Sequence, residues 1–385
     1  MLQSGVIHVV FRSCCLTGET MSAKFGVWWC GPVAAAIFVL GPLLGRVSPS
    51  AQEGQFFRIG AASTSGTFFE IGGVIASAIS KPAGSLPCEH GGSCGVPGLV
   101  AVTQATQGSV ENLRMVAAGQ IESGIVQSDI ASWAYAGTGI FAAAGPLKNL
   151  RAIASLFPET LQLVVRDDSP IQTLADLRGK HISLGQPASG TLADARVVLA
   201  AAGLTEKDMT AEYLRPGVAA ANIHDGTLDG FFIIGGVPVP AIRDLAAETP
   251  VRMIPVNGDV LAKMRERSAS YRRSVIPPGT YPGINIETPS IGFDALWIVS
   301  ADAPDDLIYA ITKALWNDAT QRLLEARDPL GKQVRLEDAL DGLSIPLHSG
   351  AKRLYREAGL PVDQNGVLGK RELRPEKGDE VRKPE

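Results

Sequence analysis

The sequence contains few of the residue types on which metal sites and nucleic-acid surfaces depend. Its 385 residues include five histidines, five cysteines and only 6% aromatic residues, and its formal net charge is −4. No two histidines show the spacing of metal ligands. Because a surface that binds phosphate backbones needs a basic excess, we expect no nucleic-acid partner. We also expect no metal and no cofactor.

Signatures of catalysis are missing as well. The chain has no G-x-S-x-G elbow and no phosphate-binding loop with a Walker lysine. Ser349 and Lys352 fit the S-x-x-K motif of penicillin-interacting serine enzymes, but the companion motifs are absent and such short matches arise by chance. The sequence therefore predicts a protein that is not an enzyme.

Only one apolar run approaches membrane-spanning length, and it lies near the N-terminus. Lys24 precedes a mostly apolar stretch from Val27 to Leu44, and small residues follow it. A basic start, an apolar core and small residues at the end predict a secretory signal peptide within residues 1–50, with Met21 as the true start. A retained membrane anchor is the alternative, which the prolines and glycine inside the run disfavour. We therefore expect a periplasmic protein.

Export makes the few cysteines informative. Three of the five precede the expected cleavage point, which leaves Cys88 and Cys94 in the mature chain. An even pair in an exported protein predicts a disulfide that closes a short loop. A metal site made by Cys88, His90 and Cys94 is the alternative, but no fourth ligand is evident.

The most informative positive feature is a strand that ends in small hydroxyl residues where a helix begins. The apolar segment 56–62 leads into Ser63-Thr64-Ser65-Gly66-Thr67, and the same device recurs near residues 108, 127 and 189. Backbone N–H groups at a helix N-terminus suit a carboxylate or another small anion. Since ligands of open α/β sheets bind beyond the carboxyl ends of the strands, these loops predict one shared cleft.

The predicted ligand-binding residues fall into groups with separate roles. The first loop forms an anion cradle with an aromatic ring beside it, the next two donate to the ligand or meet an amine or hydroxyl, and the last closes from a second lobe. For each side chain, capping of a helix is the alternative role. The residues are Ser63, Thr64, Gly66, Thr67, Phe68, Ser109, Asn112, Gln127, Asp129, Ser189, Gly190, Thr191 and Gly235.

Two long β-rich stretches divide the chain. They cover residues 151–166 and 291–299, and the block between them contains two complete strand–loop–helix units. This pattern predicts two α/β lobes joined by two crossover strands, with the ligand between the lobes. The predicted boundaries are residues 54–158 and 295–360 for lobe I, 159–294 for lobe II, and 371–385 for a disordered charged tail.

The order of these motifs resembles that of the TAXI family, the extracytoplasmic solute receptors of TRAP transporters. The segments that carry the resemblance are 63–68, 108–113, 124–129, 229–238, 278–283 and 346–351, and it spans roughly residues 55 to 360. The resemblance implies a type 2 periplasmic-binding-protein fold, no catalysis, and glutamate, related dicarboxylates or amino acids as ligands. It also implies delivery of that small organic anion to a membrane permease. A ligand-sensing subunit or an exported enzyme on a two-lobed frame are the alternatives.

Overall fold

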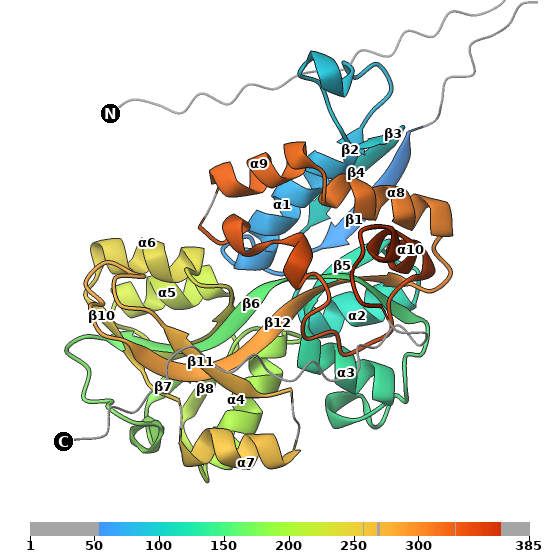
Figure 1. Ribbon diagram of the computed structural model, residues 1–385. Coiled ribbons are helices and arrows are strands. Elements are labelled where there is room, and N and C mark those ends of the chain that lie inside the picture. Colours follow the sequence, from blue (N-terminus) through green and yellow to red (C-terminus); the bar gives the residue numbers. More distant parts are fainter. Residues whose placement is uncertain (1–53, 257, 268–269, 328, 363–385) are drawn as a thin grey trace, which may run out of the picture. The chain divides into compact units, whose positions relative to one another are not determined.

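The computed structural model describes residues 54–256, 258–267, 270–327 and 329–362 (Figure 1). The predicted signal peptide, within residues 1–50, and the predicted charged tail, 371–385, lie outside the described residues. Within the described ranges, no helix is both long enough and apolar enough to cross a membrane.

A mixed ten-stranded sheet runs through the described part of the chain. Its strand order is β4-β1-β5-β12-β6-β9-β7-β8, and β10 and β11 pair with β6 and β12 respectively. The strands of this sheet are β1 (Gln55–Gly60), β4 (Leu99–Gln104), β5 (Ser123–Gln127), β6 (Leu150–Arg166), β7 (His181–Ser183), β8 (Thr210–Glu212), β9 (Gly230–Gly235), β10 (Val251–Ile254), β11 (Arg272–Ile276) and β12 (Thr288–Ser300).

Two long antiparallel strands, β6 and β12, carry the chain from one lobe to the other. They pair from Gly292 opposite Thr160 to Ser300 opposite Leu150, with two irregularities in register. The first part of β6 contributes to the lobe I core and its later part to the lobe II core. The predicted two-lobed, periplasmic-binding-protein-like α/β fold with two crossover strands is therefore confirmed.

Lobe I is built on the parallel strands β4, β1 and β5. Apolar side chains spaced three and four residues apart along one helix, Phe68, Ile71, Ile75 and Ile79, are all buried in its core. Trp297 of the crossover strand β12 packs edge-on against Phe57 at 6.4 Å in the same core. The helices of this lobe are α1 (Thr67–Ile79), α2 (Ser109–Ala117), α3 (Ser128–Ala136), α8 (Asp305–Leu315), α9 (Asp318–Arg327) and α10 (Ser349–Glu357).

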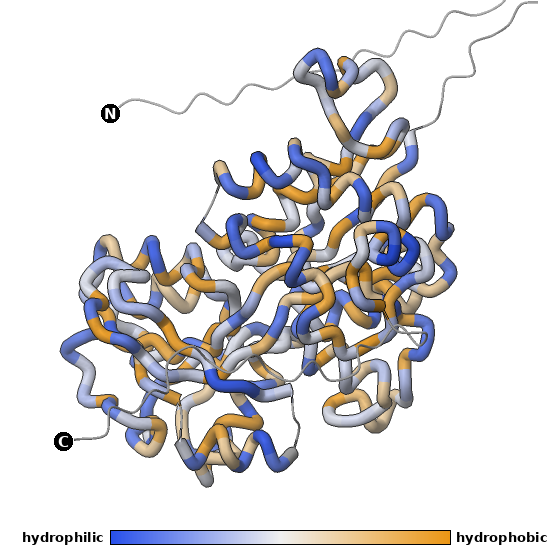
Figure 2. The backbone as a smooth tube through the Cα atoms, viewed as in Figure 1, coloured by the Kyte–Doolittle hydropathy of each residue, from blue (hydrophilic) through white to orange (hydrophobic). Residues whose placement is uncertain are grey.

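Lobe II packs helices on both faces of β9. Phe232 and Ile234 belong to one apolar cluster, whereas Phe231 and Ile233 belong to another on the opposite face. A continuous apolar run is the pattern of a strand buried on both faces. The helices are α4 (Gly190–Ala201), α5 (Pro216–His224), α6 (Pro240–Glu248) and α7 (Asp259–Arg267). In Figure 2, the most hydrophilic stretches include β11 and α10, whereas the crossover strands are mainly pale or orange.

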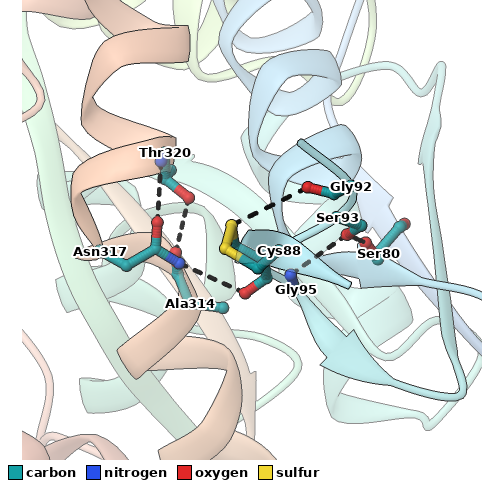
Figure 3. Close-up of a disulfide and its surroundings, with 9 residues drawn as sticks. Ser80, Cys88, Gly92, Ser93, Gly95, Ala314, Asn317 and Thr320 are labelled. Atoms are coloured by element: carbon teal, nitrogen blue, oxygen red, sulfur yellow. Dashed lines mark hydrogen bonds between the residues drawn. A yellow bond between two sulfur atoms is a disulfide. The ribbon is translucent and has the colours of Figure 1, made fainter. Parts of the chain in front are cut away.

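Cys88 and Cys94 form the predicted disulfide. It closes a loop between two short paired strands, β2 (Ser80–Lys81) and β3 (Val96–Pro97), with Cα atoms 4.7 Å apart. Figure 3 shows how this loop is fixed, since the Asn317 amide at the start of α9 donates to the Cys94 carbonyl oxygen at 3.4 Å. The disulfide therefore stabilises a loop on lobe I.

Candidate ligand-binding site

A cavity of about 60 Å³ lies between the two lobes at the carboxyl ends of the strands. Loops that follow β1 and β4 and the end of β5 supply its lobe I side, and loops that follow β7 and β8, together with β9 itself, border it from lobe II. Because each loop connects a strand end to a helix start, the topology itself brings these segments together. A cavity this small suits a ligand well below drug size.

Nine of the predicted ligand-binding residues line this cavity. Phe68 contributes an apolar wall, and the others contribute hydroxyls, an amide or glycine backbone. The nine are Ser63, Gly66, Thr67, Phe68, Ser109, Gln127, Ser189, Gly190 and Thr191. The structure thus places both predicted faces of the cleft, the first loop and the fourth, around one space.

The other four predicted residues do not border this cavity. Thr64 is exposed, and Asp129 lies buried beside Asp194 beneath the cleft. The Asn112 amide nitrogen donates to the backbone oxygens of Gly60 at 3.0 Å and Ile125 at 2.9 Å, so it ties β1 to β5.

Gly235, the last residue of β9, allows the two lobes to approach one another. A Cβ atom there would lie 3.0 Å from the Thr67 hydroxyl oxygen of lobe I. The next residue, Gly236, donates its backbone N–H to that same oxygen at 3.2 Å. Gly235 therefore borders a contact between the lobes.

Capping explains only part of the pattern of small polar residues. Ser189 does cap α4, because its hydroxyl oxygen accepts from the Leu192 N–H at 3.0 Å. By contrast, α1 and α2 have glycine at the N-cap, and α3 has Gln127 there, all without a side-chain capping bond. The hydroxyls of Thr67 and Ser109 thus have partners other than their own helix starts.

Three hydroxyl groups around the cavity are held in place by backbone N–H groups. Each oxygen already accepts a backbone N–H: Thr67 from Gly236 at 3.2 Å, Ser109 from Gln127 at 3.1 Å, and Thr191 from Ile234 at 3.1 Å. A hydroxyl that accepts one hydrogen bond still has its own proton to donate. The protons of Thr67 and Thr191 are therefore available to an acceptor-rich ligand, whereas the Ser109 hydroxyl already donates to the Gln127 side-chain oxygen at 3.5 Å.

The electrostatic field of the cavity comes from the backbone. No Asp, Glu, Lys, Arg or His is among the described residues that line it. Instead the first residues of α1, α2, α4 and α5 all border it. Each helix start carries a partial positive charge of about half a unit, so four starts around one space favour an anionic group.

The two lobes are in direct contact around the cavity. The Ser65 hydroxyl oxygen accepts from the Gly217 N–H at 3.0 Å, and the Glu111 N–H donates to the Ala188 oxygen at 3.2 Å. On the floor of the cleft, the Gln127 amide donates to Asp194 at 2.9 Å. The structure is therefore a closed form.

The loops on opposite sides of the cleft share an uncommon backbone conformation. Ala62 in lobe I and Ala188 in lobe II have positive φ angles of 59° and 57°. Non-glycine residues adopt this left-handed region at a cost, and such residues concentrate at binding sites. A bond from the Ala62 N–H to the Thr106 hydroxyl at 2.9 Å holds the first of them.

Sequence reasoning missed two amide side chains and the apolar residues of lobe II that line the cavity. Gln107 and Gln186 border the cavity, and Gln186 crosses the cleft by donating to the Gln107 oxygen at 2.6 Å. Both directly precede or follow a strand-end glycine, Gly108 or Gly185, a position that could have drawn attention to them. No such signal marked the apolar residues that lobe II contributes to the cavity. They are Leu214, Pro216, Ala219, Phe232, Ile233 and Ile234.

The Gln186 side chain leaves one acceptor unused. Its amide nitrogen donates to the backbone oxygens of Gln107 and Thr106, which fixes the orientation of the amide. Its side-chain oxygen has no hydrogen-bond partner although the residue is only 4% exposed. A ligand with an N–H or O–H group beside its anionic group would donate to this oxygen while the helix starts and hydroxyls bind the anionic group.

Comparison with known proteins places the chain in a family. Residues 59–359, more than half of the chain, match the NMT1-like family. The structure is similar to the aliphatic sulphonate-binding protein SsuA of Escherichia coli, at 17% identity over 78% of each chain with a TM-score of 0.39. It is also similar to alkanesulfonate-binding SsuA from Xanthomonas axonopodis pv. citri bound to MOPS, at 16% identity over 81% of this chain and 96% of that chain with a TM-score of 0.41.

A third similar structure is an ABC uptake transporter substrate-binding protein from Streptococcus pneumoniae with bound histidine. The identity is 17% over 74% of this chain and 96% of that chain, with a TM-score of 0.42. The family match extends from β1 to the end of α10 and so includes every loop around the cavity. On that match, the chain belongs to the NMT1-like family.

Proposed function

We propose that this protein is an extracytoplasmic solute receptor of the TAXI type. It closes its two lobes around a small organic anion and delivers that anion to a TRAP membrane permease. The observation that carries this proposal is the closed cavity between the lobes, bordered by four helix N-termini and by the Thr67 and Thr191 hydroxyls, which have protons to donate. The order of the TAXI-like motifs along the chain supports the same function, since four of them border the cavity.

The proposed ligand is a small carboxylate with a hydrogen-bond donor nearby, such as a glutamate-like amino acid. Helix starts and hydroxyls would bind the carboxylate, and the unused Gln186 oxygen would accept from the amine or hydroxyl. Phe68, Phe232 and Ile234 would contact the carbon frame. No described side chain around the cavity offers a cation, so charge stabilisation would come from the backbone.

Calorimetry on the full chain tests this function with L-glutamate, succinate, taurine and glycerol as probes. We expect at least one of the three charged probes to bind and to lower the radius of gyration in solution scattering, because ligand shifts the equilibrium towards the closed form. Glycerol carries hydroxyls without an anion and serves as the neutral control. Binding of glycerol in preference to every charged probe would overturn the anion assignment.

A further inference from the structure

Beneath the ligand cavity, three acidic side chains meet where the two lobes touch. Asp129 lies in the first turn of α3 in lobe I, Asp194 lies on α4 in lobe II, and Glu159 lies on the crossover strand β6. Their exposed fractions are 1%, 0% and 0%. We refer to Asp129, Glu159 and Asp194 as the carboxyl cluster.

The carboxyl cluster has too few donors for three ionised groups. None of the four carboxyl oxygens of Asp129 and Glu159 receives a hydrogen bond of normal geometry. Asp194 accepts from the Gln127 amide at 2.9 Å and from the Tyr271 hydroxyl at 3.4 Å. Buried carboxylates without a cation or enough donors are strongly disfavoured in the charged form.

The charged groups that face the cluster do not supply the missing cation. Arg272 on β11 is the nearest guanidinium, and it pairs with Asp294 on β12. Asp294 and, beyond it, Asp341 add further negative charge. The groups that border Glu159 and Asp294 in an adjacent polar cavity are Arg272, Arg273, Lys332, Arg335, Asp338 and Asp341.

Burial raises the pKa of every member of the cluster, and neighbouring negative charge adds to the rise at Asp194 and Glu159. Burial raises the pKa of Asp129 to about 6, a rise that Asp194 and nearby backbone N–H groups limit. Burial and the neighbouring Asp129 charge raise the pKa of Asp194 well above its usual range. Burial, followed by the charges of Asp129 and Asp294, raises the pKa of Glu159 well above its usual range, against a smaller opposing effect of Arg272.

We propose that the carboxyl cluster is a proton-binding site and that closing the two lobes takes up a proton there. In the closed form Asp194 holds the proton beside Asp129, so the repulsion between the two carboxyl groups, one on α4 and one on α3, is removed. When the lobes separate, water solvates both carboxyl groups and the proton leaves. Among the described residues, no group of three or more His, Cys, Asp or Glu side chains is arranged to hold a metal ion, so the cluster relies on protons to offset its charge.

Thermodynamic linkage between proton binding and closure determines whether a rise in pH opens or closes the cleft. A carboxyl group whose pKa is higher in the closed form favours closure fully below its open-form pKa of about 4, and this contribution is lost as the pH rises through the closed-form pKa. Uptake of one proton changes the ratio of closed to open molecules by up to about tenfold per pH unit in that window. The cleft is therefore more tightly closed in acid than in alkali.

Infrared spectroscopy and solution scattering on the ligand-free full chain test the proposal. At about pH 7 we expect the band of protonated carboxyl groups, which model carboxyls lose well below that pH, and a weaker band in the double variant Asp129→Asn with Asp194→Asn, which keeps Glu159. Between about pH 5 and about pH 8 the radius of gyration of the wild-type protein should rise, whereas that of the double variant should change much less because asparagine does not ionise.

Two further variants make the result decisive. Asp225→Asn removes an exposed carboxyl group on lobe II and should leave both the band and the pH response unchanged. Glu159→Gln tests the third member and should weaken the band while the lobes still open in alkali. Absence of the protonated band in the wild-type protein at about pH 7, or the same pH response in wild type and double variant, would overturn the proposal. Neither readout needs a ligand, so both are independent of the proposed transport function.

Discussion

Replacing Gly190 by alanine should hold the cleft open while leaving each lobe folded. Gly190 is the first residue of α4 and faces lobe I across the cleft. An added Cβ would overlap the side-chain oxygen of Gln127, and it would lie 2.5 Å from the Gln127 Cδ and 3.1 Å from the Ser109 hydroxyl oxygen. Both of those residues belong to lobe I, so the overlap exists only when the lobes meet.

The magnitude follows from the contact that must be given up. Gln127 can relieve the overlap only by moving its amide away from Asp194, to which it donates at 2.9 Å. Loss of this bond leaves a buried hydrogen-bonding group unpaired, which costs about 1–3 kcal/mol. Since about 1.4 kcal/mol corresponds to a factor of ten, the ratio of closed to open molecules should fall by about 5- to 150-fold.

Solution scattering and hydrogen exchange measure this shift without a ligand. The variant should show a larger radius of gyration and faster exchange at the Glu111 N–H, which donates across the cleft to Ala188. Gly73→Ala is the matched control, because a Cβ there has only the Thr103 hydroxyl 4.0 Å away and should leave closure unchanged. Equal radius and exchange in Gly190→Ala and the wild-type protein would refute the argument that glycine is needed for closure.

Three other substitutions give separate tests. Thr67→Val should weaken ligand binding by about 1–3 kcal/mol, because the closed form then buries an unpaired N–H, whereas Thr67→Ser should bind normally; calorimetry with the probe that binds decides. Replacing Cys88 and Cys94 by serine should lower the free energy of unfolding by roughly 2–3 kcal/mol and leave the cleft unaffected, and denaturant titration with a scattering control would show a disagreement. Burial lowers the pKa of His348 below its usual 6.5, so unfolding takes up a proton and stability should fall as the pH drops from about 7 to about 5. His348→Asn keeps a capping side chain and should lose that part of the pH dependence, and identical profiles in urea unfolding would contradict this.

The fold could be predicted because its signals are local and repeated. Continuous apolar runs such as Phe231–Ile234 indicate strands buried on both faces, and the stripe at Phe68, Ile71 and Ile75 indicates one buried helix face. The two long β-rich stretches indicated the crossovers because a chain that leaves a lobe must return to it. The order in which the strands pair, with β12 between β5 and β6, is set by contacts far apart in sequence and had no local signal.

The candidate site was accessible to sequence reasoning only where a residue type fits one conformation. Small hydroxyl and glycine residues at strand ends pointed to Thr67, Ser109 and Gly190, which the structure places around the cavity. The side chain of Asn112 has the same chemistry, yet the fold uses it to tie β1 to β5. Which of these uses applies depends on where the neighbouring strands lie, and that is decided by tertiary packing.

The position of β12 also determines the order in which the lobes can complete their structure. During synthesis the chain emerges from the N-terminus, so all of the strands of lobe II, β7 to β11, precede β12. Lobe I cannot fill the gap between β5 and β6, or bury Trp297 against Phe57, until residue 300 has been made. Lobe II is thus a continuous insertion that can fold while lobe I waits, and closing lobe I requires contacts between residues more than 200 positions apart, such as the bond from the Tyr355 hydroxyl to the Ile153 oxygen.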